Sequence, residues 1–239
     1  KPVGMNSSFG SYNRAKNISN KISAHAPVNG KAIEVPHDWN ETANAAGGIM
    51  SNIPDMAIWA EFLMNGFTTK DGKKLVSDKQ IQQLWQIQRP ISVSLKNPYD
   101  THFYGYGLGW FLSDVKGQFQ VQHTGGLIGT VTQFTLLPDL KLGIIVLTNQ
   151  QSGAAFNTIT NTIKDSYLGI EDRNWLKNYD ERMTSYFEKI EEGKKKVFSE
   201  SAAFAKNGNS PKENQYLGTY KDAWFGNVDL VKEGKNVRA

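Results

Sequence analysis

The stretch Val121-Gln122-His123-Thr124-Gly125-Gly126-Leu127 decides how the chain is interpreted, because β-prone segments precede and follow it. Residues 104–112 read YGYGLGWFL and predict one strand, and residues 130–137 (TVTQFTLL) and 142–147 (LGIIVL) predict two more. The His-Thr-Gly-Gly segment is therefore expected on a sheet strand or at its end. Glycine is costly inside a strand unless another backbone must approach closely, so this segment predicts a substrate-binding edge.

Composition limits the classes of protein to consider. The chain has 239 residues, a formal net charge of +4 and 39% hydrophobic residues, which suits one large domain with a real core. Its lysines are scattered without a basic-aromatic array, so no nucleic-acid partner is expected. The absence of cysteine excludes disulfides, thiolate chemistry and cysteine-ligated zinc. No apolar run approaches the roughly 20 residues of a membrane span.

Two helices are predicted between the glycine turn at Gly47-Gly48 and the first strand. Ser51 or Asn52 is expected to cap the first helix, with Met56, Trp59, Ala60 and Leu63 on one face, and Asn65-Gly66 ends it. Ser77 caps the second helix, with Gln80 in the capping-box position and an apolar face of Ile81, Leu84 and Trp85. Residues 91–103 are expected to form a loop.

Outside this central region the pattern is weaker. Residues 1–44 are expected to be irregular, with a short strand at 32–35. After the last strand, a helix is expected from Gly153 to about Leu168 with Phe156, Ile159, Ile163 and Tyr167 against the sheet, and another from about residue 174 to 192. Residues 199–210 look like a linker. Residues 216–220 and 227–231 alternate like strands of a new unit, too few for a stable sheet by themselves.

Two motif blocks in this order resemble the serine β-lactamase-related superfamily, in its class C β-lactamase, DD-peptidase and esterase-type branch. The first is residues 46–59, AGGIMSNIPDMAIW, and the second is Tyr106-Gly107-Leu108-Gly109-Trp110 followed by His123-Thr124-Gly125-Gly126. Pro2-Val3-Gly4-Met5 is similar to a third family segment. The resemblance covers residues 1–168 and implies a β-lactamase/transpeptidase-like α/β fold: a partial antiparallel sheet flanked by helices. It divides the chain into a hydrolase portion at 1–170, a helical linker at 171–210 and the start of a small C-terminal β domain at 211–239.

The resemblance also implies an acyl-serine hydrolase of amide or ester bonds, without metal or cofactor, that acts on a small-molecule or peptide substrate and is periplasmic or secreted. It assigns one oxyanion-binding N–H to Gly126 and substrate contacts to Thr124 and Gly125. His123 stands where the family usually has lysine; it can assist proton transfer but attracts a carboxylate less firmly. Asn149 follows the last strand and is a further candidate. Gly47 and Gly48 suit either a cleft wall or a structural turn.

The family's nucleophile is the expected feature that this sequence does not display. The one Ser-x-x-Lys is Ser113-Asp114-Val115-Lys116, which follows a strand and precedes Gly117, so a hairpin turn is expected there, and the Tyr-x-Asn segment is missing. The chain begins at Lys1, which suggests a piece of a longer protein. We therefore expect the serine to come from a preceding segment, either as a separate associated chain or outside this sequence.

Other readings remain open at this stage. The chain could be a non-catalytic binding or regulatory module that keeps the cleft without the nucleophile, or a scaffold that associates through its sheet. His25, His37 and His102 lie without ligand spacing and are expected to be surface residues in loops rather than metal ligands. Trp59, Trp85 and Trp110 are expected in the core. Tyr104 and Tyr106 are expected to pack on the sheet, where one could border the site.

Overall fold

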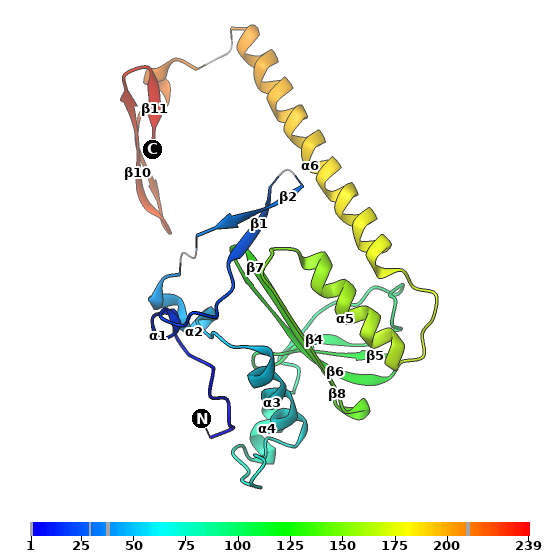
Figure 1. Ribbon diagram of the computed structural model, residues 1–239. Coiled ribbons are helices and arrows are strands. Elements are labelled where there is room, and N and C mark those ends of the chain that lie inside the picture. The colour runs from blue at the N-terminus through cyan, green and yellow to red at the C-terminus, as the bar shows by residue number, and fades with distance from the viewer. Residues whose placement is uncertain (1, 29, 37–38, 209–210) are drawn as a thin grey trace. The chain divides into compact units, whose positions relative to one another are not determined.

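A computed structural model describes residues 2–28, 30–36, 39–208 and 211–239, and His37 lies outside them. Contacts divide the chain into two compact units, Lys1–Glu181 and Arg182–Ala239. The first unit contains a large sheet with helices on both faces (Figure 1). The second holds most of a long helix and a small sheet.

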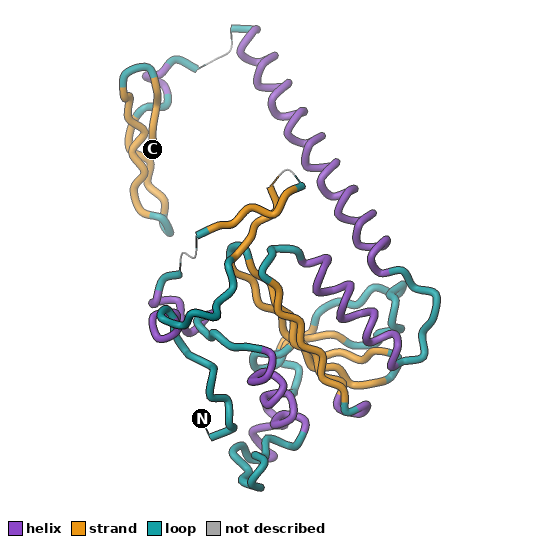
Figure 2. Tube along the Cα trace, in the orientation of Figure 1, coloured by secondary structure: helices purple, strands orange, loops and turns teal. Residues whose placement is uncertain are grey.

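A six-stranded antiparallel sheet forms the centre of the first unit. Its strands, drawn in orange in Figure 2, follow one another in the order β3-β4-β5-β6-β7-β8, so every neighbour in the sheet is also a neighbour in the chain. Their bounds are β3 Arg89–Pro90, β4 Tyr104–Tyr106, β5 Phe111–Val115, β6 Gln118–Leu127, β7 Thr130–Leu137 and β8 Leu142–Thr148. Consecutive connections explain why strand signals in the sequence map directly onto the sheet. The predicted class, an antiparallel sheet flanked by helices, is confirmed.

The single strand predicted over residues 104–112 is wrong, because it folds into two strands. Gly109 has φ +82°, and the N–H of Gly107 donates to the carbonyl of Trp110 at 2.8 Å, which closes a turn between β4 and β5. The aromatic content of this segment hides the turn, whereas its glycines signal it.

The hairpin turn predicted at Ser113–Lys116 is also misplaced. Ser113 to Val115 lie in β5, and the turn consists of Lys116 and Gly117, both with positive φ, as a type I′ two-residue hairpin requires. Ser113 is 4% exposed and its hydroxyl accepts a hydrogen bond from Nε2 of Gln120 at 3.0 Å. A buried, hydrogen-bonded strand serine agrees with the prediction that Ser113 is not the nucleophile.

The helices α3 (Ile53–Met64) and α4 (Asp78–Leu84) pack against one face of the sheet. Asn52 caps α3, and Ser77 and Gln80 form the predicted capping box at the start of α4. The core on this face contains the predicted apolar faces of both helices together with alternate residues of the sheet, namely Leu112, Val121, Phe134 and Leu136. Trp59, Trp85 and Trp110 pack against this core, as predicted.

Helix α5 (Gly153–Tyr167) covers the other face of the sheet, but not with the side predicted. Ile159, Ile163 and Tyr167 are exposed, whereas Thr160, Asn161, Lys164 and Asp165 are buried beside Phe156. The sheet face below explains the difference, because it carries buried polar side chains, Gln120, Gln133 and Thr135. The apolar spacing identified a helix correctly and assigned its buried side incorrectly.

The N-terminal residues are more ordered than their composition indicates. Short helices occur at α1 (Tyr12–Ala15), η1 (Glu41–Ala43) and α2 (Asn44–Gly47), and β1 (Ala24–Val28) pairs with β2 (Lys31–Val35). The predicted strand at 32–35 is confirmed as part of β2. Strand β1 was not predicted, because it contains a proline and lies among polar residues.

The helix predicted over residues 174–192 extends much further, since α6 runs from Trp175 to Lys206. The predicted linker at 199–210 is therefore wrong up to residue 206. Glycine inside a helix costs roughly 1 kcal/mol, and two exposed ion pairs near Gly193, Lys194–Glu191 and Lys196–Glu200, recover part of that cost. No helix in the described part of the chain has the length and apolar character to cross a membrane.

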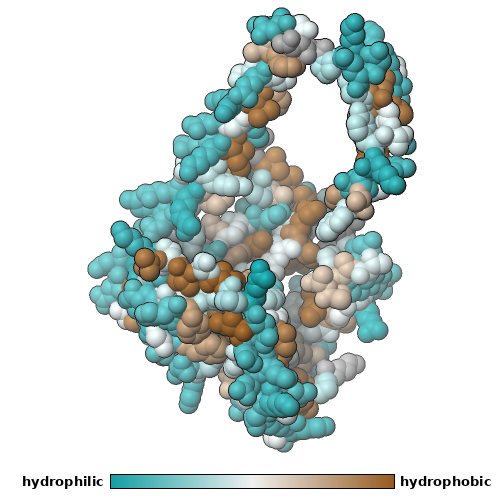
Figure 3. Space-filling view, turned by 180° about the vertical axis from the view of Figure 1, so that it is seen from behind, coloured by the Kyte–Doolittle hydropathy of each residue, from teal (hydrophilic) through white to brown (hydrophobic). Residues whose placement is uncertain are grey.

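In the second unit, α6 carries exposed apolar side chains, and a small sheet follows. Apolar patches are visible along this helix (Figure 3), and its exposed apolar residues include Met183, Tyr186, Phe187, Val197, Phe198 and Phe204. The strands β9 (Gly218–Asp222), β10 (Gly226–Glu233) and β11 (Asn236–Arg238) form an antiparallel sheet in the order β11-β10-β9. The strand predictions at 216–220 and 227–231 are confirmed within two residues.

Candidate functional site

The His-Thr-Gly-Gly segment lies at the end of β6, and it projects beyond β5. Pairing of β5 with β6 stops at Phe111 opposite Gln122, whereas pairing of β6 with β7 continues to Leu127 opposite Thr130. Residues 123–127 therefore have a partner strand on the β7 side but, among the residues that the structure describes, no strand on the β5 side. The backbone of this segment presents a free edge.

The strand register identifies which backbone groups point to that free edge. In an antiparallel ladder, the N–H and C=O of one residue point to the same neighbour, and successive residues alternate between neighbours. Leu127 and Thr130 close a two-residue turn, so Leu127, Gly125 and His123 bond to β7. Thr124 and Gly126 consequently direct their N–H and C=O groups to the free edge.

The side chains of the segment leave this edge accessible. Thr124, Gly125 and Gly126 are exposed and His123 is half-buried. A Cβ atom at Gly125 would lie 2.6 Å from Oγ1 of Thr132, so glycine there serves packing within the sheet. A Cβ atom at Gly126 would meet nothing within 4 Å, so Gly126 faces open space.

The imidazole of His123 is fixed by hydrogen bonds at both nitrogens. Nε2 lies 3.0 Å from the hydroxyl of Tyr106, and Nδ1 lies 2.6 Å from the carbonyl oxygen of Thr124. The ring also packs 5.6 Å from the ring of Phe111, centroid to centroid. Tyr106 therefore borders the candidate site, while burial raises the pKa of its neighbour Tyr104, which packs on the sheet.

Asn149 is not brought to the free edge. It follows Thr148, the last residue of β8, which is level with Gly126 because Gly126, Val131 and Thr148 are successive partners across the sheet. Two strand spacings separate β8 from β6, a distance of about 10 Å, and β7 lies between them. The carbonyl of Asn149 instead lies 3.0 Å from Nδ1 of His25.

The first motif block reaches the end of β6 through Gly47. A Cβ atom on Gly47 would lie 3.0 Å from the ring of Trp39 and 3.8 Å from Cδ2 of Leu127. Trp39 is held by a 2.7 Å hydrogen bond from its Nε1 to Oδ1 of Asn44. The Ala-Gly-Gly and His-Thr-Gly segments thus meet at one end of the sheet. Trp39 has no periodic pattern around it, and its role was not predicted.

His25 and His102 each make structural contacts. His25 lies in β1, not in a loop as predicted, and its backbone N–H donates to the carbonyl of Gly129 at 2.9 Å. His102 lies in a loop, exposed as predicted, with Nδ1 2.9 Å from the buried Asp114 carboxylate. Within the described ranges, no group of three His, Asp or Glu side chains could hold a metal ion.

A polar cluster is buried under α5, away from the free edge. Nζ of Lys164 donates to Oε1 of Gln120 at 3.0 Å and lies 4.1 Å from the centre of the Tyr99 ring. Burial lowers the pKa of Lys164 to about 8, and the adjacent Asp165 charge opposes part of this shift. Burial, aided by Asp165, raises the pKa of Tyr99. This cluster holds α5 on the sheet.

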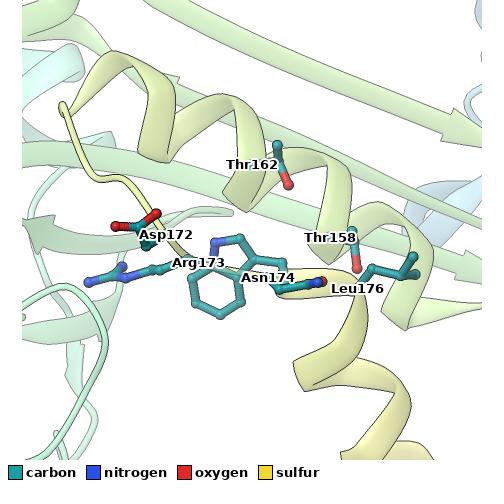
Figure 4. A pocket seen from close by; sticks show the side chains of 7 residues that line it. Thr158, Thr162, Asp172, Arg173, Asn174 and Leu176 are labelled. Atoms are coloured by element: carbon teal, nitrogen blue, oxygen red, sulfur yellow. The ribbon is translucent and has the colours of Figure 1, made fainter.

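A pocket of about 390 Å³ lies between α5 and the start of α6 (Figure 4). Its lining residues come from these two helices and the loop between them: Thr158, Thr162, Asp172, Arg173, Asn174, Trp175 and Leu176. Arg173 points to the Asp165 side, where Nη1 lies 3.6 Å from the carboxylate, and Nη2 donates to the carbonyl of Pro98. None of the predicted site residues lines this pocket.

One family model and several known proteins resemble part of this chain. The Beta-lactamase family model matches residues 1–168. The Unguisins hydrolase ungD of Aspergillus violaceofuscus is 27% identical over 158 residues, which are 61% of this chain and 28% of that protein. The Unguisins hydrolase ungD' of Aspergillus campestris is 26% identical over 153 residues, 62% of this chain and 27% of that protein. This chain thus spans little more than a quarter of the length of these relatives.

Among solved structures, the octameric penicillin-binding protein homologue from Pyrococcus abyssi superposes with a TM-score of 0.59 at 21% identity. The match covers 71% of this chain and 36% of that chain. At this identity the likeness concerns the fold, an antiparallel sheet with helices on both faces.

Proposed function

The chain belongs to the Beta-lactamase family, and on that premise we propose that it forms the substrate-binding part of a serine hydrolase. The reaction is cleavage of an amide or ester bond through an acyl-serine intermediate. The hydrolases named among its relatives support a hydrolytic reaction. The substrate is a D-amino-acid peptide, a β-lactam or an ester, and the reactive serine is supplied from outside the 239 residues.

The proposal depends on one observation, the free strand edge at Thr124 and Gly126. An extended substrate can add to an exposed strand edge through its own peptide groups, which gives affinity independent of side chains. The N–H of Gly126 points to that edge and is suited to hold the oxyanion that develops when a serine attacks the carbonyl. Glycine at this position lets the substrate carbonyl approach the backbone.

The decisive experiment is covalent labelling of the protein expressed from its full open reading frame. Incubation with a fluorophosphonate or a fluorescent penicillin is expected to add one probe per molecule, detected by intact mass. The isolated 239-residue chain is expected to remain unlabelled. A folded full-length protein that forms no adduct would contradict the hydrolase proposal and favour a binding or regulatory module that keeps the edge without the chemistry.

Gly126→Ala in the full-length protein is expected to slow acylation about tenfold, equivalent to about one weakened hydrogen bond in the transition state. The new methyl group meets no protein atom within 4 Å, so folding should not change, but the methyl group occupies the space through which a substrate carbonyl approaches. The measurement is the rate of probe adduct formation. Gly10→Ala is the matched control, since its added Cβ also meets nothing within 4 Å and Gly10 belongs to no strand of the sheet. Equal rates for both variants would argue against substrate at this edge.

A further inference from the structure

We propose that Tyr106 is a positioning residue, which holds the His123 imidazole in one tautomer and keeps it over the carbonyl of Thr124. The consequence for catalysis rests on the function proposed above. The hydrogen-bond arrangement itself concerns only three residues of this chain.

The chemistry of the two partners fixes the direction of both hydrogen bonds. A carbonyl oxygen can only accept, so the 2.6 Å contact with Thr124 requires a hydrogen on Nδ1 of His123. In the neutral ring, Nε2 then carries a lone pair and must accept. The Tyr106 hydroxyl, 3.0 Å away, is therefore the donor to Nε2. The carbonyl of Thr124 selects the Nδ1–H tautomer, and the Tyr106 hydroxyl, which then takes the donor role, keeps the ring where that carbonyl acts on it.

The aromatic frame around the imidazole keeps this geometry in place. Tyr106 lies opposite Phe111 in the ladder of β4 and β5, and their rings meet edge to face with centroids 4.7 Å apart. Phe111 in turn packs on the imidazole at 5.6 Å. Tyr106 thus acts from β4, across the end of β5, on a ring carried by β6. Among the residues that the structure describes, its hydroxyl supplies the directional contact to Nε2.

This arrangement changes the charge that the free edge presents to a substrate. Thr124 and Gly126 both direct backbone groups to the edge, and an uncovered Thr124 carbonyl would repel an oxyanion held by the N–H of Gly126. The Nδ1–H of the His123 imidazole donates to that carbonyl, so the uncovered groups at the edge are mainly backbone N–H donors. Loss of the Tyr106 hydroxyl would let the ring adopt the other tautomer or rotate, and the carbonyl oxygen would be exposed. We therefore expect the hydroxyl to favour acylation through His123.

The chain contains a matched control for this inference. Tyr104 lies on the same strand, stacks on Phe111 at 5.6 Å, and in the described structure makes no hydrogen bond to His123. Tyr106→Phe and Tyr104→Phe each remove one hydroxyl group from the same aromatic cluster. Only the first removes the donor to Nε2.

The first test is the tautomer of His123, observed by ¹⁵N NMR of the side-chain nitrogens in the full-length protein and assigned with His123→Gln. The wild type and Tyr104→Phe are expected to show a single Nδ1–H form, and Tyr106→Phe a mixture. An Nε2–H form in the wild type, or an unchanged signal in Tyr106→Phe, overturns the inference. This result does not depend on whether the protein reacts with any probe.

The second test is the acylation rate of the same variants. Tyr106→Phe is expected to acylate about tenfold more slowly, the effect of one lost hydrogen bond, with Tyr104→Phe within twofold of the wild type. Equal loss in both variants, or none in Tyr106→Phe, contradicts the positioning role. If no variant, including the wild type, forms an adduct, the hydrolase proposal fails, while the tautomer measurement still decides the role of Tyr106 at the edge.

Discussion

Replacing Lys164 by methionine is expected to abolish a rise of about 2 kcal/mol in the free energy of unfolding between pH 7 and pH 9.5. Lys164 is 5% exposed, and burial lowers its pKa to about 8 in the folded protein, from the ordinary value of 10.5. At any pH between these two pKa values the unfolded chain binds more protons than the folded chain, so the free energy of unfolding of the wild type increases with pH. Below pH 8 both states are protonated, and the cost of burying the charge is present in full.

The measurement is urea denaturation at a series of pH values up to 9.5. Above about pH 10 the raised pKa of Tyr99 acts in the opposite sense, because the unfolded chain loses a proton that the folded chain keeps. The expected result is a rising curve for the wild type and a flat one for Lys164→Met. Lys79→Met, at an exposed position of α4, should retain the rise. A rise that persists in Lys164→Met would show that another group is responsible.

Replacing Gly129 by alanine is expected to destabilise the first unit by about 3 kcal/mol or more. Gly129 has φ +80°, a conformation that costs energy for any residue with a side chain. A Cβ atom there would lie 2.6 Å from Val35, 2.7 Å from Cβ of Ala24 and 2.8 Å from the backbone nitrogen of His25. Two of these contacts are with rigid or backbone atoms, so the β1–β2 hairpin would have to move away from the turn between β6 and β7.

Two measurements separate global from local effects of this substitution. The denaturation midpoint reports the loss of stability, and hydrogen exchange at the N–H of His25, which donates to the carbonyl of Gly129, reports detachment of β1. Gly126→Ala in the same strand end is the control, because its Cβ meets no atom within 4 Å. A change below about 0.5 kcal/mol, within the range of ordinary surface substitutions, together with unchanged exchange, would contradict the close approach at Gly129.

The sequence predicts the central fold well where a pattern of spacing and a local hydrogen bond agree. The capping box at Ser77 and Gln80, the apolar face of α3 and the strands β7 and β8 follow from such agreement. The prediction of a single strand over residues 104–112 failed because the glycine turn between β4 and β5 outweighs the β propensity of the segment. Helix α6 was predicted too short because the prediction ended it before Gly193, whereas the helix continues through this glycine, with ion pairs at helical spacing beside it.

The errors at α5 and at the site have a different cause. Periodicity identifies two sides of a helix but not which side meets the sheet, and on α5 the decision depends on Gln120 and Gln133, which are distant in sequence. The His-Thr-Gly-Gly segment was placed correctly at a strand end. The sequence left open which tyrosine borders the site and could not show that Tyr106 reaches His123, nor that β7 separates Asn149 from the edge, because both depend on how strands pair.

The free edge of β6 has a consequence for how enzymes built on this strand could diversify. A contact made by peptide groups is the same whichever amino acids carry those groups, so mutation of surrounding side chains can alter what the neighbouring loops accept without rebuilding the anchoring ladder. New substrate preferences would then arise by remodelling the periphery while the reactive carbonyl keeps its place. An inhibitor shaped as a short extended backbone should accordingly tolerate varied decoration and fail once its own amide groups are methylated.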